Sequence, residues 1–539
     1  MTRAVAGALV ALALTAALAL RVARLEVRPM HHDEANQAIK FGDLLERGEY
    51  RYDFRDHHGP TLYYLTLPSA WAGRRHTLGS LDELTLRRVP VAFGIATILL
   101  LPLLTAGIGR TAVAVATILM ALSPAMVFYS RMFIQEALFA CFAFAFVIAI
   151  GRIATNAGRT WWILAGIAAG FAAATKETAV IVLPAAIIAS AIAWWSVGSR
   201  RPSNAITTGR WRMPLVMAVA AAASVAIVFY SSFFASPAGL LEPFRGSRTY
   251  LARGIDPANH AHPWHYYFHL LTYTSSGGLK WSEGLVAGLA LAGAVTAWRQ
   301  YAPSDTEGRF WARYLSADVA ITASIFSVIP YKTPWNVLAF YVVAFPLAGI
   351  GFASLLEMTR SRAMRGLLIS GLTVACFSLG SQAWRAAVTY AADPRNPYVY
   401  AQTVPDAVRM ARRILDLAPL HADGMRMQVS VIAPPYEQWP LPWYLRGMPN
   451  VGYWTAPGDD LAMGAPVIVS SLQYAPALDA ALGDRYVSEF FGLRPDVLLT
   501  LYIERGLWNR RERNGASDDS ASEVKRASRG AGGPDDSKK

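Results

Sequence analysis

Residues 335–356 read WNVLAFYVVAFPLAGIGFASLL, a run without a single charged side chain. As a helix this run would be about 33 Å long at ~1.5 Å per residue, enough to cross the roughly 30 Å hydrocarbon core of a bilayer. The whole chain of 539 residues is 54% hydrophobic and only 16% charged. Because soluble domains usually carry about a quarter charged residues, this composition indicates a membrane protein.

Similar apolar segments recur along the first 390 residues. The first of them, Val5–Leu20, is short, but no convincing cleavage site marks it as a signal peptide, so we interpret it as a span. The others are Val89–Ile108, Ala112–Phe128, Ile134–Ile150, Trp161–Ala174, Ala179–Trp195, Pro214–Phe234, Gly284–Trp298, Tyr314–Ile329 and Gly366–Trp384. Together with the opening run they predict a polytopic α-helical membrane protein of about eleven transmembrane helices. The stretch Gly59–Trp71 is too short to span and is expected to be interfacial or re-entrant.

The basic residues give an orientation. If the N-terminus is cytoplasmic, the inward loops hold most of the arginine, whereas the short outward turns hold only Arg131, Lys176 and Lys332. The C-terminus then lies outside, in a multi-pass protein of the cell inner or plasma membrane. The net charge of +13 comes mainly from these loop arginines, so no basic patch indicates a nucleic-acid partner.

The apolar runs stop near residue 390. A helical pattern at Val404–Leu417 and β-rich runs at Met427–Ile432, Pro466–Ser470, Tyr486–Phe491 and Val497–Ile503 follow. They predict a C-terminal extracytoplasmic α/β domain over residues 390–508, after a transmembrane domain over residues 1–389. Residues 509–539 are polar and predict a disordered tail. The two cysteines, Cys141 and Cys376, lie in apolar runs and offer neither a disulfide framework nor a zinc site.

Histidine is confined to the outward side of this topology. All ten histidines fall in segments assigned to that side: His31, His32, His57, His58, His76, His260, His262, His265, His269 and His421. Ionisable residues at a membrane boundary cost free energy unless they have partners or water, so their gathering on one side proposes a site there.

An acidic pair, Asp33 and Glu34, follows the first span. A carboxylate held near an acceptor hydroxyl can act as a general base, which makes both residues catalytic candidates. The structural alternative is an acidic flank to a helix cap. His57 and His58 precede the short apolar stretch, and neither a turn nor a membrane anchor requires them, so they are candidates for substrate binding.

Three cations occupy separate outward turns. Arg131, Lys176 and Lys332 are candidates for binding a lipid phosphate, because both side-chain types pair with phosphate oxygens. The alternative is snorkelling toward lipid headgroups. Their sequence neighbours are candidates for substrate binding: Glu136, Glu177, His262 and Trp335.

His262, His265 and His269 have helical spacing, so a metal site can be drawn on one face of a helix. An aromatic interfacial helix would show the same polar stripe, and we favour that interpretation. The metal requirement stays open, with a divalent cation as a possible cofactor.

Short motifs occur in a specific order within residues 1–505: Met30-His31-His32-Asp33-Glu34-Ala35, Tyr52-Asp53, His57-His58-Gly59-Pro60, Ser130-Arg131, Lys176-Glu177, His262-Pro263-Trp264 and Tyr331-Lys332-Thr333-Pro334-Trp335-Asn336. In this order they resemble the GT-C clan of glycosyltransferases, in the branch of protein O-mannosyltransferases and aminoarabinose transferases. The nearest resemblance is to the flippase-activity-associated proteins of archaeal N-glycosylation. Runs near Tyr398 and Trp439 resemble the C-terminal part of that subgroup.

The resemblance implies a membrane enzyme that transfers a sugar from a polyprenyl-phosphate-linked donor to a protein, lipid or glycan acceptor on the outer face, inverting the anomeric carbon. Asp33 matches the acidic residue that lies by the acceptor in such enzymes. Two other functions remain open: a flippase-associated component without transferase activity, and a scaffold whose outer domain binds envelope partners. In the outer domain, Trp439, Trp443, Tyr444 and Arg446 are expected either to contact the acceptor or to dock the domain.

Overall fold

The computed structural model describes residues 1–48, 50–53, 58–155, 158–198, 211–246, 260–299, 305–458 and 460–514. The chain divides into two compact units. The first comprises Met1–Arg28 and Gln37–Tyr400, and the second comprises Pro29–Asn36 and the chain from Ala401 onward. Helix α2 (His32–Arg47) runs from the second unit into the first.

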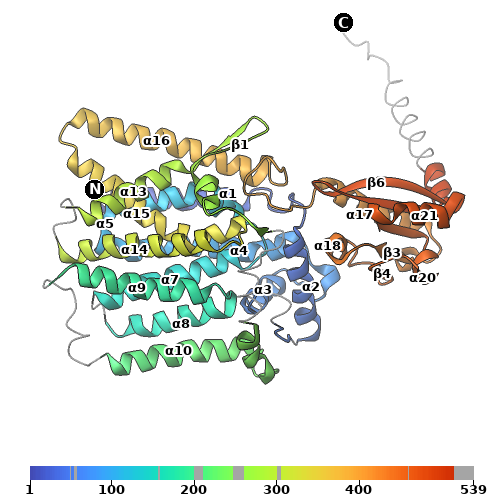
Figure 1. Ribbon diagram of the computed structural model, residues 1–539, viewed down its shortest axis with the longest axis horizontal. Helices are drawn as coiled ribbons and strands as arrows, with labels where there is room; N and C mark the ends of the chain where they lie inside the picture. Colours follow the sequence, from blue (N-terminus) through green and yellow to red (C-terminus); the bar gives the residue numbers. More distant parts are fainter. Residues whose placement is uncertain are drawn as a thin grey trace, which may run out of the picture. The chain divides into compact units, whose positions relative to one another are not determined.

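The first unit is a bundle of helices with one short hairpin. Its elements are α1 (Arg3–Val22), α3 (Thr61–Ala72), α4 (Glu83–Leu100), α5 (Thr105–Leu122), α6 (Pro124–Tyr129), α7 (Glu136–Ala154), α8 (Thr160–Thr175), α9 (Ala179–Ser196), α10 (Arg212–Tyr230), α12 (Tyr266–Thr272), β1 (Thr274–Ser276), β2 (Leu279–Trp281), α13 (Gly284–Trp298), α14 (Thr306–Val328), α15 (Leu338–Met358) and α16 (Arg362–Trp384). Figure 1 shows α7, α8, α9, α10 and α14 side by side.

Every segment predicted as a span overlaps one of these helices. Among the described residues, seven helical stretches are long and apolar enough to cross a membrane, which agrees with a multi-pass membrane protein. Helices α8 and α13 are apolar but have only 16 and 15 residues. Since a span needs about 20 residues, the number of eleven spans stays a prediction.

Helices α13 and α15 pack with their backbones in contact. A Cβ atom on Gly351 would lie 2.0 Å from the carbonyl oxygen of Leu289, and one on Gly293 would lie 2.2 Å from that of Leu347. Small residues permit such close approach between membrane helices, where van der Waals packing drives association.

A buried carboxylate joins several parts of the first unit. Glu283 precedes α13 and is fully buried. Its oxygens accept hydrogen bonds from the Ser123 hydroxyl (2.5 Å), the Ala125 backbone N–H (2.9 Å), the Tyr341 hydroxyl (2.9 Å) and the Tyr398 hydroxyl (2.7 Å). Burying a charge is costly unless it is fully hydrogen-bonded, and these four donors meet that condition.

The second unit contains a five-stranded mixed sheet with strand order β4-β3-β5-β7-β6. Its elements are α17 (Pro405–Leu417), β3 (Val429–Ile432), α18 (Pro435–Gln438), α19 (Leu441–Tyr444), β4 (Val451–Trp454), α20 (Asp460–Met463), β5 (Val467–Ser471), α21 (Ala475–Leu482), β6 (Tyr486–Arg494) and β7 (Val497–Glu504). Strands β4, β3 and β5 are parallel, whereas β7 is antiparallel to both β5 and β6.

Side chains alternate along the strands, so the sheet presents apolar residues on both faces. Helices cover each of these faces. Val467 and Val469 of β5 pack with the residues of α17, whereas Ile468 packs with Leu478 of α21. The four predicted strands overlap β3, β5, β6 and β7. The sequence analysis missed β4, whose four residues are all half-buried and include a glycine.

One prediction needs correction at the C-terminal end of the described chain. Residues 505–514 are helical, so the first six residues of the predicted disordered tail are ordered. Leu507 is fully buried and Trp508 packs against the same core as α17. These two apolar side chains stand directly before the polar residues and pack the start of this helix against the core of the second unit.

Candidate functional site

The turn between α8 and α9 is the centre of a buried polar cluster in the first unit. Lys176 Nζ lies 2.7 Å from Glu136 Oε1, at the start of α7, and 2.8 Å from Asn336 Oδ1. The side chains of Lys176 and Glu136 are only 5% and 4% exposed. Residues from three separate predicted turns therefore come into direct contact.

A second pair lies next to it in the sequence. His58 Nδ1 is 2.8 Å from Glu177 Oε2. The segment that carries His58 is fixed by the Gly59 N–H, which donates to the Thr175 carbonyl over 3.1 Å, and by a 2.7 Å bond between the hydroxyls of Thr61 and Thr175. Burial alone would raise the pKa of Glu177, but the charge and hydrogen bond of His58 lower it to about 2. Glu177 is therefore ionised at neutral pH.

Gly59 makes this docking possible. A Cβ atom there would lie 2.0 Å from the carbonyl oxygen of Ala174, a backbone atom that has no room to move. The segment leads directly into α3, which has 12 residues and matches the short apolar stretch that was predicted not to span.

Lys332 is buried in a different way. Its Nζ donates to the backbone carbonyls of His262 (3.1 Å) and Ile329 (2.5 Å), and the residue is 1% exposed. Within the described ranges, no carboxylate forms an ion pair with this ammonium at 4.0 Å or less. Burial lowers the pKa of Lys332. Among the residues that the structure describes, the partners of this buried cation are therefore two backbone carbonyls.

Aromatic side chains adjoin Lys332. The ring of His262 stacks on Tyr266 at 4.3 Å, and His260 Nδ1 lies 2.8 Å from the Tyr400 hydroxyl. Trp335 and Tyr400 meet edge to face at 5.8 Å. Burial, together with the charges of His260 and Lys332, lowers the pKa of His262. Aromatic rings of this kind therefore gather beside the buried lysine.

The three histidines proposed as weak metal candidates do not converge. His262 is half-buried, whereas His265 and His269 are exposed. In the part of the chain that the structure describes, no group of three or more His, Cys, Asp or Glu side chains is arranged to hold a metal ion. The possible divalent cofactor named in the sequence analysis stays an open expectation.

Arg131 makes structural contacts that the sequence did not predict. Its guanidinium donates to the carbonyls of Leu20 (2.8 Å), Arg21 (2.9 Å) and Arg24 (3.3 Å), at the end of α1. A cation at this position satisfies terminal carbonyls and complements the helix dipole. The geometry therefore makes Arg131 a cap of α1, which the sequence could not reveal because the two segments are more than a hundred residues apart.

The predicted acidic pair belongs to the second unit, where its two members differ. Glu34 is fully buried, and its Oε2 accepts the backbone N–H of His31 over 3.0 Å at the start of α2. Glu34 therefore closes the helix N-terminus, as in a capping box, which is the structural alternative named for the acidic pair. The side chain of Asp33 is 37% exposed, with Oδ2 3.7 Å from His31 Nδ1. Of the two carboxylates, Asp33 is the one that a substrate can reach.

Most of the proposed acceptor contacts are used inside the second unit. Trp443 is fully buried, and the Arg446 guanidinium lies 3.7 Å from its ring centroid. The Tyr444 hydroxyl accepts the Met30 N–H over 2.8 Å. Trp439 packs at 5.7 Å from the ring of His32.

Two further residues complete the comparison between the predicted site and the structure. His57 lies outside the described residues, so its predicted role is not assigned a place here. Asn336 contacts Lys176 but was not singled out, although it stands in the quoted motif that contains Lys332.

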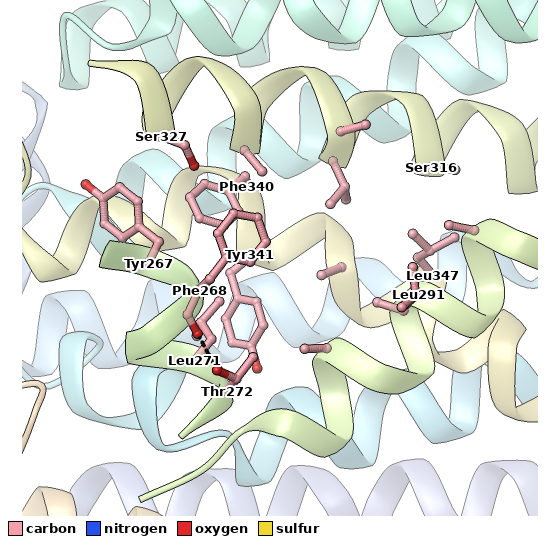
Figure 2. A pocket seen from close by; sticks show the side chains of 17 residues that line it. Tyr267, Phe268, Leu271, Thr272, Leu291, Ser316, Ser327, Phe340, Tyr341 and Leu347 are labelled. Carbon is pink, nitrogen blue, oxygen red and sulfur yellow. Dashed lines mark hydrogen bonds between the residues drawn. The ribbon is translucent and has the colours of Figure 1, made fainter. Parts of the chain in front are cut away.

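An apolar cavity of about 260 Å³ lies between α12, α13, α14 and α15. Figure 2 shows the rings of Tyr267, Phe268, Phe340 and Tyr341 at one end and Leu291, Ser316 and Leu347 toward the other. The Tyr267 hydroxyl donates to the carbonyl of Thr333, the residue after Lys332, over 3.2 Å. One end of the cavity is therefore next to the buried lysine.

Comparisons with known proteins agree with this architecture. The model of the dolichyl-phosphate-mannose-protein mannosyltransferase family matches residues 75–230. No curated protein matches the chain significantly.

Solved structures match over most of the chain. ArnT from Cupriavidus metallidurans bound to undecaprenyl phosphate is 14% identical, with a TM-score of 0.59 over 94% of this chain and 99% of that one. The oligosaccharyltransferase AglB from Archaeoglobus fulgidus, in complex with an inhibitory peptide and a dolichol-phosphate, is 12% identical, with a TM-score of 0.53 over 94% of this chain and 77% of that one. The chain therefore shares its fold with ArnT and AglB over almost its whole length.

Proposed function

We propose that this protein is an integral membrane glycosyltransferase that moves a sugar from a polyprenyl-phosphate-linked donor to an acceptor on the outer face of the membrane. The observation that carries the proposal is the fold, shared over almost the whole chain with ArnT, whose structure contains undecaprenyl phosphate. The site features described above are consistent with such a donor.

Lys332 is the proposed ligand of the donor phosphate. Among the described residues its buried ammonium donates to two backbone carbonyls, so an arriving phosphate would supply an anionic partner. The apolar cavity that begins near Thr333 offers an environment for isoprenoid units of the same lipid. The sugar would then contact the side chains of Trp335, His262 and Tyr400.

Asp33 is the proposed general base. Its carboxylate takes the proton of the acceptor hydroxyl while that oxygen attacks the anomeric carbon. The bond between the anomeric carbon and the phosphate oxygen breaks, and the electron pair leaves with the polyprenyl phosphate. A single displacement of this kind inverts the anomeric configuration.

The test uses purified full-length protein and a panel of undecaprenyl-phosphate-linked mannose, glucose and aminoarabinose, with release of undecaprenyl phosphate as the readout. We expect Asp33→Asn to abolish release while the protein stays folded. Asp423→Asn is the matched control, because Asp423 lies 3.5 Å from His421 two residues earlier, in the same local arrangement as His31 and Asp33.

Two results would contradict the proposal. If no member of the panel is bound or cleaved by the wild type, the donor class is wrong. If Asp33→Asn and Asp423→Asn release product equally well, Asp33 is not the base.

One observation favours the alternative of a component of lipid-linked sugar translocation. Asp318 is fully buried in the middle of α14, and neither carboxylate oxygen has a hydrogen-bond partner among the described residues. An ionisable side chain within a membrane span is a functional candidate in transporters. Loss of lipid-linked sugar movement across proteoliposomes in Asp318→Asn, with normal sugar release, would favour translocation. Unchanged movement would remove this alternative.

A further inference from the structure

Another cavity lies at the opposite end of the first unit from the buried polar cluster. Glu136, which contacts Lys176, begins α7, whereas Arg152 lies in the last turn of the same helix. This helix of 19 residues is about 28 Å long at ~1.5 Å per residue. The cavity beside Arg152 is therefore remote from the proposed donor site, at the end of the bundle that the basic residues predict to be cytoplasmic.

Three arginines from three helices line this cavity, which has a volume of about 670 Å³. Arg3 begins α1, Arg110 lies in α5, and Arg152 lies near the end of α7. None of the described residues that line the cavity is acidic. We call this cavity, with its three arginines, the basic hollow.

The guanidinium groups of the basic hollow have few anionic partners. Arg110 Nη1 donates to the Met1 carbonyl over 3.4 Å, and Arg152 Nη2 donates to the Leu103 carbonyl. Glu307 Oε1 lies 3.9 Å from Arg152 Nη1, and the Glu307 side chain is 39% exposed. This long ion pair is the one that the described residues offer to the three arginines. A cavity with such an excess of positive charge attracts anions.

The backbone next to Arg110 adds hydrogen-bond donors. Gly109 has a φ of 82° and a ψ of 159°, which interrupts α5, so a new helical segment begins at Arg110. The first N–H groups of a helix have no carbonyl partner within it. Gly109 and Thr111 line the hollow together with Arg110. Phosphate oxygens fit this combination, because guanidinium groups bind them through two parallel hydrogen bonds and a helix start favours negative charge.

The surroundings of the basic hollow are those of a membrane boundary. Helix α1 and the stretch that contains α4 and α5 are both candidate membrane spans. Apolar side chains close to the hollow in sequence are exposed: Val5 is 50% exposed, Leu99 53% and Leu103 39%. A phospholipid matches this arrangement, because its acyl chains adjoin its phosphate. Basic pockets between membrane helices on the cytoplasmic side are suited to lipid headgroups.

We propose that the basic hollow binds the phosphate group of an anionic phospholipid, whose acyl chains cover the exposed side chains of Val5, Leu99 and Leu103. The bound phosphate links the start of α1 to α5 and α7. This site lies at the other end of the bundle from Lys332 and does not depend on transferase activity. Arginines that only orient the chain in the membrane would bind headgroups no more tightly than other arginines at the same level.

The experiment measures lipid binding by the full-length protein in detergent micelles. Native mass spectrometry gives the affinity for added phosphatidylglycerol or phosphatidylcholine, and thermal unfolding gives the stabilisation by each lipid. The test variant is Arg3→Gln/Arg110→Gln, which removes two exposed charges of the hollow. The matched control is Arg360→Gln/Arg362→Gln, which removes two exposed charges between α15 and α16.

The control variant lies at the same end of the bundle. Helix α15 follows Asn336, which contacts Lys176, so its last residues and the turn at Arg360 lie at the opposite end. Both double variants remove the same charge at the same membrane level. Only Arg3→Gln/Arg110→Gln changes the basic hollow.

We expect the wild type to bind phosphatidylglycerol at least tenfold more tightly than phosphatidylcholine. In Arg3→Gln/Arg110→Gln this affinity should fall about tenfold or more, because charge-assisted hydrogen bonds to the phosphate are lost, while Arg360→Gln/Arg362→Gln should match the wild type. Equal binding of the two lipids by the wild type would overturn the proposal. Equal affinities of the two double variants for phosphatidylglycerol would overturn it as well.

Sodium phosphate in place of lipid separates a headgroup from a free anion. We expect inorganic phosphate at millimolar concentration to leave the Tm of the wild type unchanged, because it cannot cover the exposed apolar side chains beside the hollow. A rise in Tm equal to that with phosphatidylglycerol, absent in Arg3→Gln/Arg110→Gln, would show that the hollow binds a soluble anion and that the lipid proposal is wrong.

Discussion

Lys176 and Lys332 are two buried lysines on two turns of the same unit, and their ammonium groups have different partners. Within the described part of the chain, Lys176 meets a carboxylate at 2.7 Å, whereas Lys332 donates to the carbonyls of His262 and Ile329. An ion pair is already neutral and has little to gain from a phosphate. A cation held by dipoles keeps its charge available. Both lysines are buried, so we propose that the partner decides whether a lysine here serves the fold or a ligand.

The largest expected effect breaks the neutral pair. Lys176→Ala leaves Glu136 as a buried carboxylate without its counter-charge, which costs about 3–5 kcal/mol. Thermal unfolding in detergent should show a large drop in Tm, whereas Lys280→Ala, at an exposed position of β2, should leave it unchanged.

The double variant Lys176→Met/Glu136→Met sharpens this result. It removes both charges and should recover most of the stability. If Lys176→Ala unfolds at the wild-type temperature, the pair does not hold α7 to the α8–α9 turn.

The next effect concerns the segment that docks beside Lys176. Gly59→Ala places a Cβ against the carbonyl oxygen of Ala174 and should destabilise the first unit by about 1–3 kcal/mol. Gly79→Ala is the matched control, because a Cβ at Gly79 has nothing within 4 Å. Equal unfolding temperatures for the two variants would show that the backbone adjusts at Gly59.

Lys332 should give the opposite profile to Lys176. In Lys332→Gln the side chain can still donate to a carbonyl, so Tm should change little, while the affinity for undecaprenyl phosphate should fall about tenfold, or ~1.4 kcal/mol. Equilibrium binding of undecaprenyl phosphate measures this. Wild-type affinity in Lys332→Gln together with weakened binding in a folded Lys176 variant would reverse the comparison.

The smallest effect depends on pH. The pKa of Glu177 is lowered from 4.5 to about 2 in the folded protein, so its contribution to stability is present above about pH 4.5 and is lost as the pH falls toward 2. The side chain is 27% exposed, so screening reduces this contribution to on the order of 1–2 kcal/mol. The stability difference between wild type and Glu177→Gln should be largest near pH 7 and shrink below pH 4. A constant difference across this range would contradict the pairing with His58.

The sequence predicted the helices of the first unit because long apolar runs between charged turns can adopt few other structures in a bilayer. It also identified the turn residues Lys176, Glu177, Lys332 and His58 as candidates, since their side chains are unusual at such places. These predictions used only local composition and spacing.

Partnership could not be predicted in the same way. Glu136 pairs with Lys176 across 40 residues, and Arg131 caps α1 across more than a hundred. Nothing local distinguishes a lysine that meets a carboxylate from one that meets carbonyls. The contacts of Met30 and His32 with residues after 400 were missed for the same reason. Chain order suggested that residues 29–36 belong with the membrane helices.

The Glu283 carboxylate has a consequence for biosynthesis. Two of its four donors, from Ser123 and Ala125, precede it in the chain, but the Tyr341 and Tyr398 hydroxyls follow it, the latter by 115 residues. Until translation has passed residue 398, the carboxylate that precedes α13 therefore has at most three of these four donors and needs water or a proton. Closure of the bundle around Glu283 is accordingly a late event, and a ribosome-bound chain that stops before Tyr398 should still expose this carboxylate to solvent.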